Sequence, residues 1–307
     1  MTTLLVAFLV SVIAAATPLL LAAVGELVAE KAGVLNLGVE GMMLGGAIAG
    51  FATAHETGAP ILGIAAALAT GVALALIFGI ITLTLQANQT GTGLALTIFG
   101  RGLSSLLGAG YVGIPAPVLP KLYLPGLSDI PILGPVLFSQ DALVYVSFAL
   151  LIACAWFLRR TQPGLIVRAV GDSHDAAHSL GYPVLLIRYA AVLFGGAMAG
   201  LAGAYMSLAY TPLWAQDLTA GRGWVAVALV TFAAWRPFWL LIGAWLFGAL
   251  MYLSLYVQAV GVAIPSALLS ALPYIGTVIM LVLISRDRRR IRLHRPAMLG
   301  RPFMAGS

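Results

Sequence analysis

The sequence predicts an all-α fold, a polytopic transmembrane helical bundle, and two observations indicate it. Hydrophobic residues make up 61% of the 307 residues and charged residues only 8%, with a mean hydropathy of +1.04. The apolar residues also lie in long uncharged runs, and about 20 such residues are enough to cross a bilayer as a helix. Because no long stretch has a soluble composition, we expect a single transmembrane domain over residues 1–307.

Each span is predicted from one uncharged apolar run. We expect about nine spans, and roughly eight to ten fit the length. The runs cover residues 4–28, 34–53, 61–85, 93–107, 142–158, 189–210, 223–235, 238–257 and 267–284. The run 223–235 would measure only about 20 Å as a straight helix, so it should be tilted, broken or extended by its flanks. The first run has no Lys or Arg before it, which favours a retained span over a secretory signal.

The positions of Lys and Arg predict the orientation, because basic residues favour the cytoplasmic ends of spans. The tail 285–307 holds Arg286, Arg288, Arg289, Arg290, Arg292, Arg295 and Arg301. If the spans alternate, an internal tail also places inside Lys31, Arg159, Arg160, Arg168, Arg188 and Arg236. The N-terminus and the loop 110–140 then face the exterior with Lys121 and Arg222, while Arg101 lies within the fourth span. The basic tail indicates a membrane anchor, and we expect no nucleic-acid binding.

A polar segment over residues 168–183, RAVGDSHDAAHSLGYP, interrupts the apolar sequence between the fifth and sixth spans. Charged residues are costly inside a bilayer, so the segment should lie in water, within a cytoplasmic region 159–188 that begins at Arg159. It is either an ordinary solvated connection with a helical turn or a docking element for a cytoplasmic subunit.

The segment is predicted to form one helix of two or three turns. Asp172 is placed to accept the free N–H groups at its start, and Gly181 is placed to end it before Pro183. Asp175 and His178 are three residues apart and share a face. A small face for packing is supplied by Ala176, Ala177 and Leu180.

A second candidate site surrounds Glu40, which lies a few residues inside an apolar run. A carboxylate at membrane depth indicates a functional site. Asn36 is nearby, and Gly38 and Gly41 would allow a broken or closely approached helix, as in transport pathways. The alternative is that Glu40 lies at the interface, hydrated or paired with Lys31.

A third candidate, QANQTGTGLAL, joins two spans at residues 86–96. It is either a tight loop broken by Gly91 and Gly93 or a polar lining for the inner end of a pathway, with Asn88 and Gln89 as its lining residues. We expect no catalytic residues and no metal site. Ser–His and metal-ligand patterns are missing, and the lone Cys154 fits a small buried residue. No GxxxxGK[ST] occurs, so ATP-driven transport would need another chain to bind the ATP.

Four segments carry a resemblance to a known family: EKAGVLNLGVEGMMLGGAIAG (30–50), NQTGTGLALTIFGRGLSSLLG (88–108), PGLIVRAVGDSHDAAHSLGYPV (163–184) and GRGWVAVALVTFAAWRPFWLLIGAWLFG (221–248). They resemble the permease subunits of bacterial ABC importers, in the branch for nucleosides and simple sugars that is related to ribose-type permeases. The resemblance runs in the same order from about residue 17 to 285.

The resemblance implies an inner-membrane permease that pairs with a second permease, either homologous or identical. Two cytoplasmic ABC ATPase subunits would bind ATP, leaving this chain without a cofactor, and an extracytoplasmic lipoprotein would deliver the solute. The segment 168–183 would be the coupling helix seated in the ATPase, with Arg168, Gly171, Asp172, Asp175, Ala176, Ala177, Leu180 and Gly181 as coupling residues. Asn36, Gly38, Glu40 and Gly41 fall on the family's N-x-G-x-E-G motif near the pathway.

One alternative from a different class stays open on the residues alone. A stand-alone secondary transporter driven by H⁺ or Na⁺ would use Glu40 as its ion site. It would carry its solute without any ATPase subunit.

Overall fold

The computed structural model describes residues 2–115, 117–123, 125–259 and 294–303, with single positions between 260 and 293. The described helices, in chain order, are α1 (Thr2–Lys31), α2 (Val39–Thr57), α3 (Pro60–Gly79), α4 (Gln89–Gly108), α5 (Ala142–Arg160), α6 (Gln162–Asp172), α7 (His174–Ser179), α8 (Val184–Tyr205), α9 (Arg222–Phe232) and α10 (Pro237–Ala259). Short segments η1 (Ile80–Thr84) and η4 (Met206–Tyr210) prolong α3 and α8, and η2 (Ala109–Tyr111) and η3 (Gly134–Phe138) lie between α4 and α5. The predicted all-α class is confirmed for the described residues.

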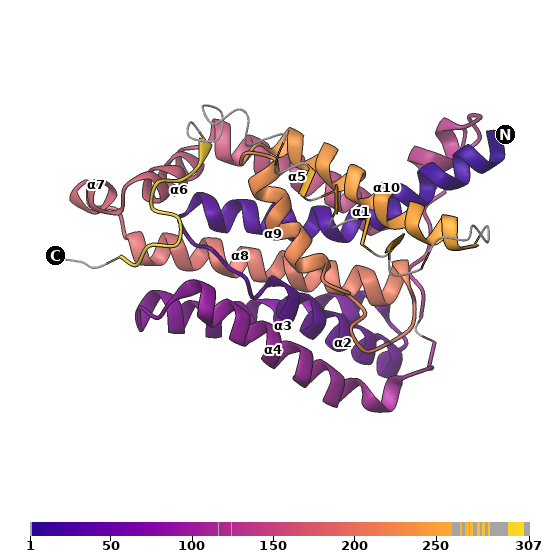
Figure 1. Ribbon diagram of the computed structural model, residues 1–307, viewed down its shortest axis with the longest axis horizontal. Helices are drawn as coiled ribbons and strands as arrows, with labels where there is room; N and C mark the ends of the chain where they lie inside the picture. Colours follow the sequence, from indigo (N-terminus) through magenta and orange to yellow (C-terminus); the bar gives the residue numbers. More distant parts are fainter. Residues whose placement is uncertain are drawn as a thin grey trace.

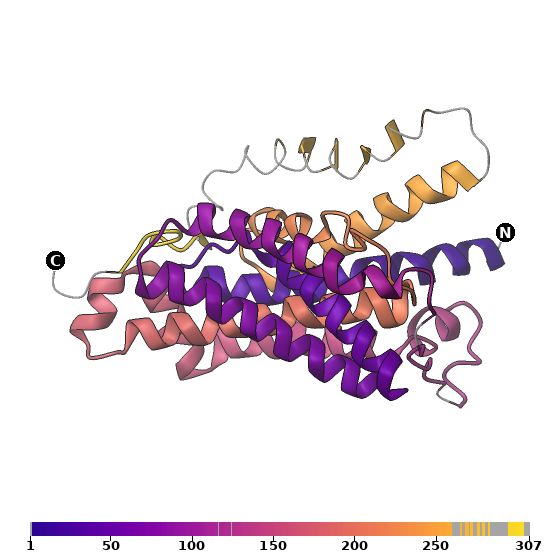
Figure 2. The same cartoon turned by 90° about the horizontal axis from the view of Figure 1, so that it is seen from below.

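The long helices run side by side along the longest axis of the molecule (Figures 1 and 2). The N-terminus and the connection between α4 and α5 lie at one end. The helices α6 and α7 and the C-terminus lie at the other, which is called the α7 end below. Successive long helices can therefore pass from one end of the bundle to the other, as membrane spans do.

Helix α8 lies at the centre of the bundle and packs against α1, α2 and α3. Small residues make these close contacts possible, because an ideal Cβ at Gly46 of α2 would lie 2.6 Å from the Cα of Gly200 on α8. Gly71 of α3 meets the backbone of Gly196 in the same way. Backbones that approach this closely are typical of helix packing in lipid. Lipid tails are as apolar as the side chains, so the helices associate through close van der Waals contacts instead of the hydrophobic effect.

Five described helices are long and apolar enough to cross a membrane: Leu5–Lys31, Pro60–Thr84, Ala142–Arg160, Val184–Tyr210 and Pro237–Gln258. The predicted second and fourth spans correspond to α2 and α4, which are long helices outside that set. The predicted ninth span, 267–284, falls largely outside the described residues, as do arginines 286 to 292 of the tail. The count of nine spans stays a prediction.

The predicted run 223–235 forms the short helix α9, which has 11 residues. It ends where Ala234 and Trp235 adopt positive φ angles of 48° and 54°. Trp235 is buried and donates its Nε1–H to Glu30 Oε2 at 2.5 Å. A buried carboxylate of α1 therefore holds the indole at the end of α9.

Candidate functional site

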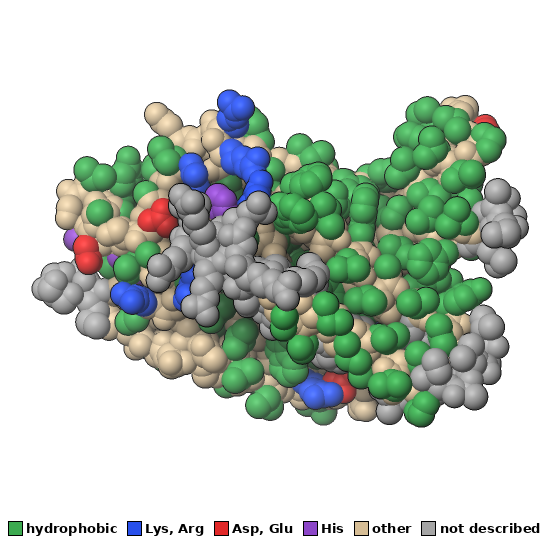
Figure 3. All heavy atoms as spheres, turned by 45° about the horizontal axis from the view of Figure 1, so that its top comes forward, with side chains coloured by type: hydrophobic (Ala, Val, Ile, Leu, Met, Phe, Trp, Pro, Cys, Tyr) green, Lys and Arg blue, Asp and Glu red, His purple; other side chains and the backbone are tan. Residues whose placement is uncertain are grey.

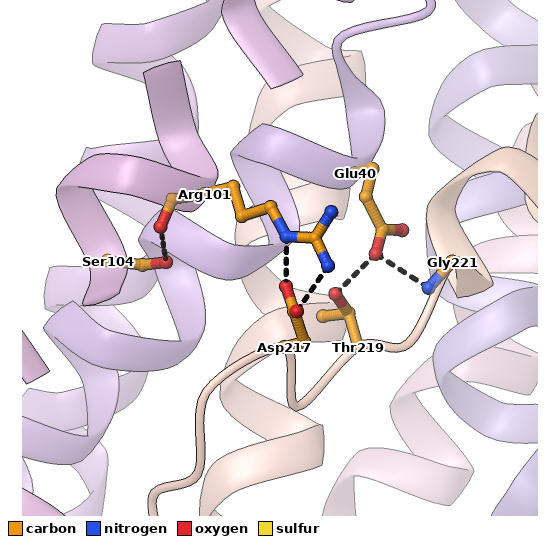
Figure 4. A network of polar contacts seen from close by, with 6 residues as sticks. All are labelled: Glu40, Arg101, Ser104, Asp217, Thr219 and Gly221. Atoms are coloured by element: carbon orange, nitrogen blue, oxygen red, sulfur yellow. Dashed lines mark hydrogen bonds and ion pairs between the residues drawn. The ribbon is translucent and has the colours of Figure 1, made fainter. Parts of the chain in front are cut away.

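Glu40 lies in the first turn of α2 and is 6% exposed. Its Oε1 accepts hydrogen bonds from the Thr219 hydroxyl at 2.5 Å and the Gly221 N–H at 2.8 Å, and its Oε2 accepts from the Gly223 N–H at 2.6 Å. Figure 4 shows the carboxylate turned toward the connection that precedes α9. The partner is not Lys31, so the predicted alternative of a Glu40–Lys31 pair is wrong.

Glu40 caps the start of α9 from another helix. The N-cap of α9 is Gly221, which has no side chain and a φ of 81°. The first N–H groups of a helix lack partners within the helix, and here the Glu40 carboxylate accepts two of them. The same carboxylate lies in the first turn of α2, so it meets the positive ends of two helix dipoles. This arrangement stabilises a negative charge inside the bundle.

The chain between α1 and α2 is not helical, and this break includes Asn36 and Gly38, while Glu40 and Gly41 lie in the first turn of α2. Asn36 donates its backbone N–H to Glu26 Oε1 at 2.9 Å and accepts from the Gly38 N–H at 2.8 Å. The neighbouring Leu37 carbonyl accepts from the Thr97 hydroxyl at 2.9 Å. Side chains of α1 and α4 therefore satisfy the backbone groups that the break leaves free, as buried irregular backbone at membrane depth requires.

Glycines let α4 and α9 approach the Glu40 region. An ideal Cβ at Gly41 would lie 2.5 Å from the Leu96 carbonyl of α4, and one at Gly100 would lie 2.6 Å from the Cα of Gly41. An ideal Cβ at Gly223 would lie 2.6 Å from the Cα of Glu40. Real Cβ atoms do not come this close, so each substitution would push two backbones apart.

Arg101 of α4 forms an ion pair with Asp217, which lies on the same connection as Thr219 (Figure 4). The guanidinium binds both carboxylate oxygens, with Arg101 Nε donating to Asp217 Oδ1 at 2.5 Å. The two side chains are 61% and 43% exposed. From the sequence, Arg101 was placed within the fourth predicted span with no anionic partner. The structure shows that Asp217 is this partner.

Two further carboxylates lie near the break, those of Glu26 and Glu30, and no role was predicted for them from the sequence. Glu26 and Glu30 lie one helical turn apart on α1, and they are 1% and 0% exposed. Glu26 holds Asn36, and Glu30 holds Trp235. The signal that could have found them is their spacing, because two acidic residues four apart at the end of a predicted span share one face of the helix, next to its apolar part.

The two predicted pathway residues at the start of α4 have structural partners. The Asn88 side chain caps α4 by accepting the Gly91 N–H at 2.8 Å. Gln89 is buried, and its Oε1 accepts the Leu35 N–H at 2.8 Å. Gly91 and Gly93 lie inside the helix, so their predicted role as loop breakers is wrong. Gly93 instead allows α4 to pass close to the backbone of Leu37.

The polar segment 168–183 forms parts of two helices, and the prediction of one helix capped by Asp172 is wrong. Asp172 is the last residue of α6. Ser173 begins α7, and its hydroxyl accepts the Ala176 N–H at 3.2 Å. The extended backbone of Ser173, with a φ of −155°, separates the helices.

The predicted end of α7 at Gly181 is confirmed. Gly181 has a φ of 84°, its N–H bonds to the His178 carbonyl at 2.8 Å, and the Tyr182 N–H bonds to the Ala177 carbonyl at 3.1 Å. These two bonds form the Schellman arrangement that commonly ends helices at glycine. The turn fixes how the chain leaves α7 for α8.

The predicted coupling residues divide into an exposed and a buried set. Asp172, Asp175, Ala176 and Leu180 are exposed, Leu180 at 76%, and Arg168 is half-buried. Gly171 and Ala177 are buried; Ala177 packs with Val170 and Val184, and Gly171 meets the Lys31 carbonyl. Ala177 and Gly171 therefore support the position of α7 from within, and they do not face outward.

The described part of the tail connects α6 to the break between α1 and α2. Met298 N–H bonds to the Gly171 carbonyl at 2.9 Å, and Gly300 N–H bonds to the Gly33 carbonyl at 3.1 Å. The buried Arg188 of α8 donates to the carbonyls of both Gly33 and Arg301. The break, the α6–α7 segment and the tail are thus linked at one end of the bundle.

The ring of His174 contacts the Phe303 ring, with centroids 5.8 Å apart, and His174 is 3% exposed. Burial and, to a smaller extent, the nearby Arg188 charge lower the pKa of His174 to about 4. His174 is therefore neutral at physiological pH and packs as an aromatic side chain.

An apolar cleft lies away from the polar network. It measures about 600 Å³ between α5, α6 and α8, and apolar side chains such as Cys154, Phe157 and Phe194 line it. A polar solute would find almost no hydrogen-bonding groups there, so this cleft is not a candidate for solute binding. In the described residues, no group of three His, Cys, Asp or Glu side chains could hold a metal ion.

Comparison with known proteins gives consistent matches over nearly the whole chain. The family model for the permease component of branched-chain amino acid transport systems matches residues 8–284. A Haloferax volcanii protein, provisionally named a glucose ABC transporter permease, is 40% identical over 93% of both chains. The guanosine ABC transporter permease of Bacillus subtilis is 33% identical, and the nucleoside ABC transporter permease of Lactococcus lactis is 30% identical, each over 87% of this chain and 88% of its own. No solved structure gives a significant match.

Proposed function

The chain belongs to the family of permease components of branched-chain amino acid transport systems, and from that premise we propose that it imports a nucleoside or a simple sugar. Membership makes it a multi-pass membrane subunit of an ABC transporter with no enzymatic activity of its own. The observation that supports a polar solute most directly is the Arg101–Asp217 pair on the face of α4.

The translocation pathway runs along that face of α4 and the connection 211–221. Charged side chains within membrane segments face water or protein, because exposure to lipid is costly. Arg101 and Asp217 are both well exposed in the single chain, so water or a second subunit covers them in the membrane. A second permease, identical or homologous, presents its own α4 face and closes the pathway.

The Glu40 network holds the wall of this pathway. Thr219 and Gly221 bind Glu40, and Asp217 on the same connection binds Arg101. A movement of α2 or α9 is therefore transmitted to the charge pair. Alternating access needs such a link between the polar wall and the helices that move.

The α7 end faces the cytoplasm of the cell whose inner membrane holds the transporter. Lys31, Arg159, Arg168, Arg188 and Arg236 all lie at this end, as the basic-residue distribution requires. The N-terminus then lies outside. Two ATPase subunits bind the exposed surface of α7, and an extracytoplasmic lipoprotein delivers the solute at the opposite end.

The solute is neutral and polar. The charges of Arg101 and Asp217 cancel, so the pathway offers hydrogen-bonding groups without a fixed counter-ion for a charged solute. The relatives named for guanosine, nucleosides and glucose transport solutes of this chemistry.

The test is uptake into proteoliposomes that contain this chain with the ATPase subunits, second permease and lipoprotein encoded beside it. The solutes are a radiolabelled purine nucleoside, glucose and, because the family description names branched-chain amino acids, leucine. We expect uptake of the nucleoside or of glucose that requires ATP and survives collapse of the proton and sodium gradients. Uptake that continues without the ATPase and stops with the gradients would identify a secondary transporter instead.

The geometry of Glu40 gives the secondary transporter little support. All three of its hydrogen bonds come from groups of the chain, two of them backbone N–H groups at a helix start. A carboxylate that serves as an ion site needs a free oxygen or neighbouring acceptor oxygens. The Glu40 surroundings supply donors, which favour a permanently bound carboxylate.

A further inference from the structure

A basic pocket lies at the α7 end, and none of the residues of the Glu40 network lines it. It measures about 360 Å³ and is lined by Lys31, Leu158, Arg159, Arg168, Trp235, Arg236, Pro237 and His294. Figure 3 shows Lys and Arg side chains gathered at this end, while hydrophobic side chains cover most of the rest of that face. Three helices, α1, α5 and α6, and the connection between α9 and α10 each contribute a cation to one small volume.

The cations of this pocket have few anionic partners among the described residues. The one ion pair that the described residues form is Arg101–Asp217, which lies elsewhere. Lys31 Nζ donates to the His294 carbonyl at 2.7 Å, and Arg168 Nε is buried without a hydrogen-bond partner in the described part of the chain. Glu30 and Asp172 are the carboxylates that act on Lys31, and Glu30 already accepts from Trp235. The pocket therefore has an excess of positive charge.

His294 reports the same electrostatic environment. Its pKa is lowered first by burial and then by the neighbouring charges of Lys31, Arg236 and Arg159. Lys31, Arg236 and Arg159 therefore all lie close enough to His294 to disfavour a further positive charge there.

The pocket lies at the ends of apolar helices. Lys31 and Arg159 are at the ends of the apolar helices α1 and α5, and Pro237 is the first residue of α10. Trp239, in the first turn of α10, is 44% exposed, and tryptophan favours the membrane interface. In a membrane that these helices span, the ends of the helices meet the lipid headgroups.

We propose that this pocket binds the phosphate of an anionic phospholipid. Arginine and lysine hold phosphate oxygens through charge-assisted hydrogen bonds, and basic pockets between spans at the cytoplasmic side suit anionic headgroups. The same chemistry would bind a soluble phosphate, but the level of the pocket and its apolar neighbours Leu158 and Trp235 favour the lipid.

The test is native mass spectrometry of the full-length chain in an uncharged detergent, with phosphatidylglycerol, phosphatidylcholine and inorganic phosphate as probes. We expect phosphatidylglycerol to stay bound, and the double variant Arg159→Gln/Arg236→Gln to weaken that binding by about tenfold or more. Arg160→Gln is the matched control, because Arg160 is exposed on the same helix and does not line the pocket. The variant Arg159→Lys/Arg236→Lys, which keeps both charges, should retain most of the binding.

Two outcomes would overturn the proposal. One is equal loss of phosphatidylglycerol in the double Gln variant and the Arg160→Gln control, or no loss in either. The other is displacement of the lipid by inorganic phosphate, which would assign the pocket to a soluble anion. Thermal unfolding of each variant shows whether it is folded, and the exposed single variant Arg159→Gln serves if the double variant is not.

Discussion

Glu40 illustrates how a single residue can organise a membrane protein at a point where two helices begin. Its charge inside an apolar run was visible in the sequence, but its partners Thr219, Gly221 and Gly223 lie about 180 positions along the chain. No local pattern connects them, because a backbone N–H donor leaves no mark in the sequence. The glycines near Glu40 indicated either a broken or a closely approached helix, whereas nothing in the sequence indicated the capping of α9.

Replacing Glu40→Gln should lower both stability and transport. In this variant the side-chain NH₂ group of glutamine replaces one carboxylate oxygen that now accepts a backbone N–H. That buried N–H then has no acceptor, which costs about 1–3 kcal/mol. We expect a drop in the thermal unfolding temperature and uptake reduced at least about tenfold. The matched control is Glu56→Gln, because Glu56 is exposed and accepts one hydrogen bond from the Tyr111 hydroxyl. Wild-type uptake by Glu40→Gln would contradict the assigned role.

The Arg101–Asp217 pair makes a second prediction at this scale. Arg101→Asp or Asp217→Arg alone places two like charges together at membrane depth, and we expect uptake to fall at least about tenfold. The double exchange restores an opposite pair and should recover part of the uptake. A double variant no better than either single variant would show that the pairing itself does not matter. Surface expression measured beside uptake separates a folding defect from a transport defect.

At the scale of single elements, the most consequential one is α7, with its neighbours α6 and the tail. The end of α7 at Gly181 was predictable, because a glycine shortly before a proline is a local signal. The start of α7 was not. Asp172 and Ser173 are both good capping residues, and the hydrogen bond of Ser173 to the Ala176 N–H decides between them. The docking of Phe303 on His174 joins residues far apart in the sequence and has no local signal either.

The Gly181 turn predicts a coupling defect. A side chain in the left-handed region costs roughly 1–2 kcal/mol, so Gly181→Val should distort the exit from α7. We expect less solute transported per ATP hydrolysed while the ATPase rate persists. Gly58→Val is the matched control, since Gly58 also has a positive φ and open space around it but follows α2, outside the coupling segment. An equal change in both variants would indicate general strain.

His174 predicts that the docking of α7 depends on pH. The folded protein has a His174 pKa of about 4 and the unfolded chain the ordinary value of 6.5, so the unfolded state binds the proton first as the pH falls. Stability at this element is therefore present above about pH 6.5 and is lost between about 6.5 and 4. Arg188 on α8 and Asp175 on α7 are the charged groups that act on the ring.

Hydrogen exchange of the α7 amides, corrected for intrinsic rates, should accelerate over that pH range. His174→Phe removes the titrating group from the buried site and should abolish the effect. His178→Phe leaves it unchanged, because His178 is exposed. An α7 whose protection is the same at pH 7 and pH 4.5 would contradict the prediction.

At the scale of the whole molecule, polar groups gather in two regions. The Glu40 network lies within the bundle, where α2 and α9 begin, and the exposed Arg101–Asp217 pair lies beside it. The basic residues, the break after α1 and the α6–α7 segment are linked at one end. Composition and charge distribution predicted this division, because lipid imposes it on any sequence. They could not show which helices share contacts, since apolar spans of Ala, Leu and Gly carry little pairing information.

The central claim is that a separate ATPase grips this permease through the exposed surface of α7. It is tested most directly by disulfide crosslinking in membranes that contain the whole transporter. One cysteine is introduced in the groove of the ATPase and one in this chain, in which Cys154 has first been replaced by Ser. We predict that Leu180→Cys, at a position 76% exposed, crosslinks to the ATPase, while Ala177→Cys, at a position 2% exposed, does not. Crosslinks from Lys121→Cys in the connection at the opposite end, with none from Leu180→Cys, would contradict the account.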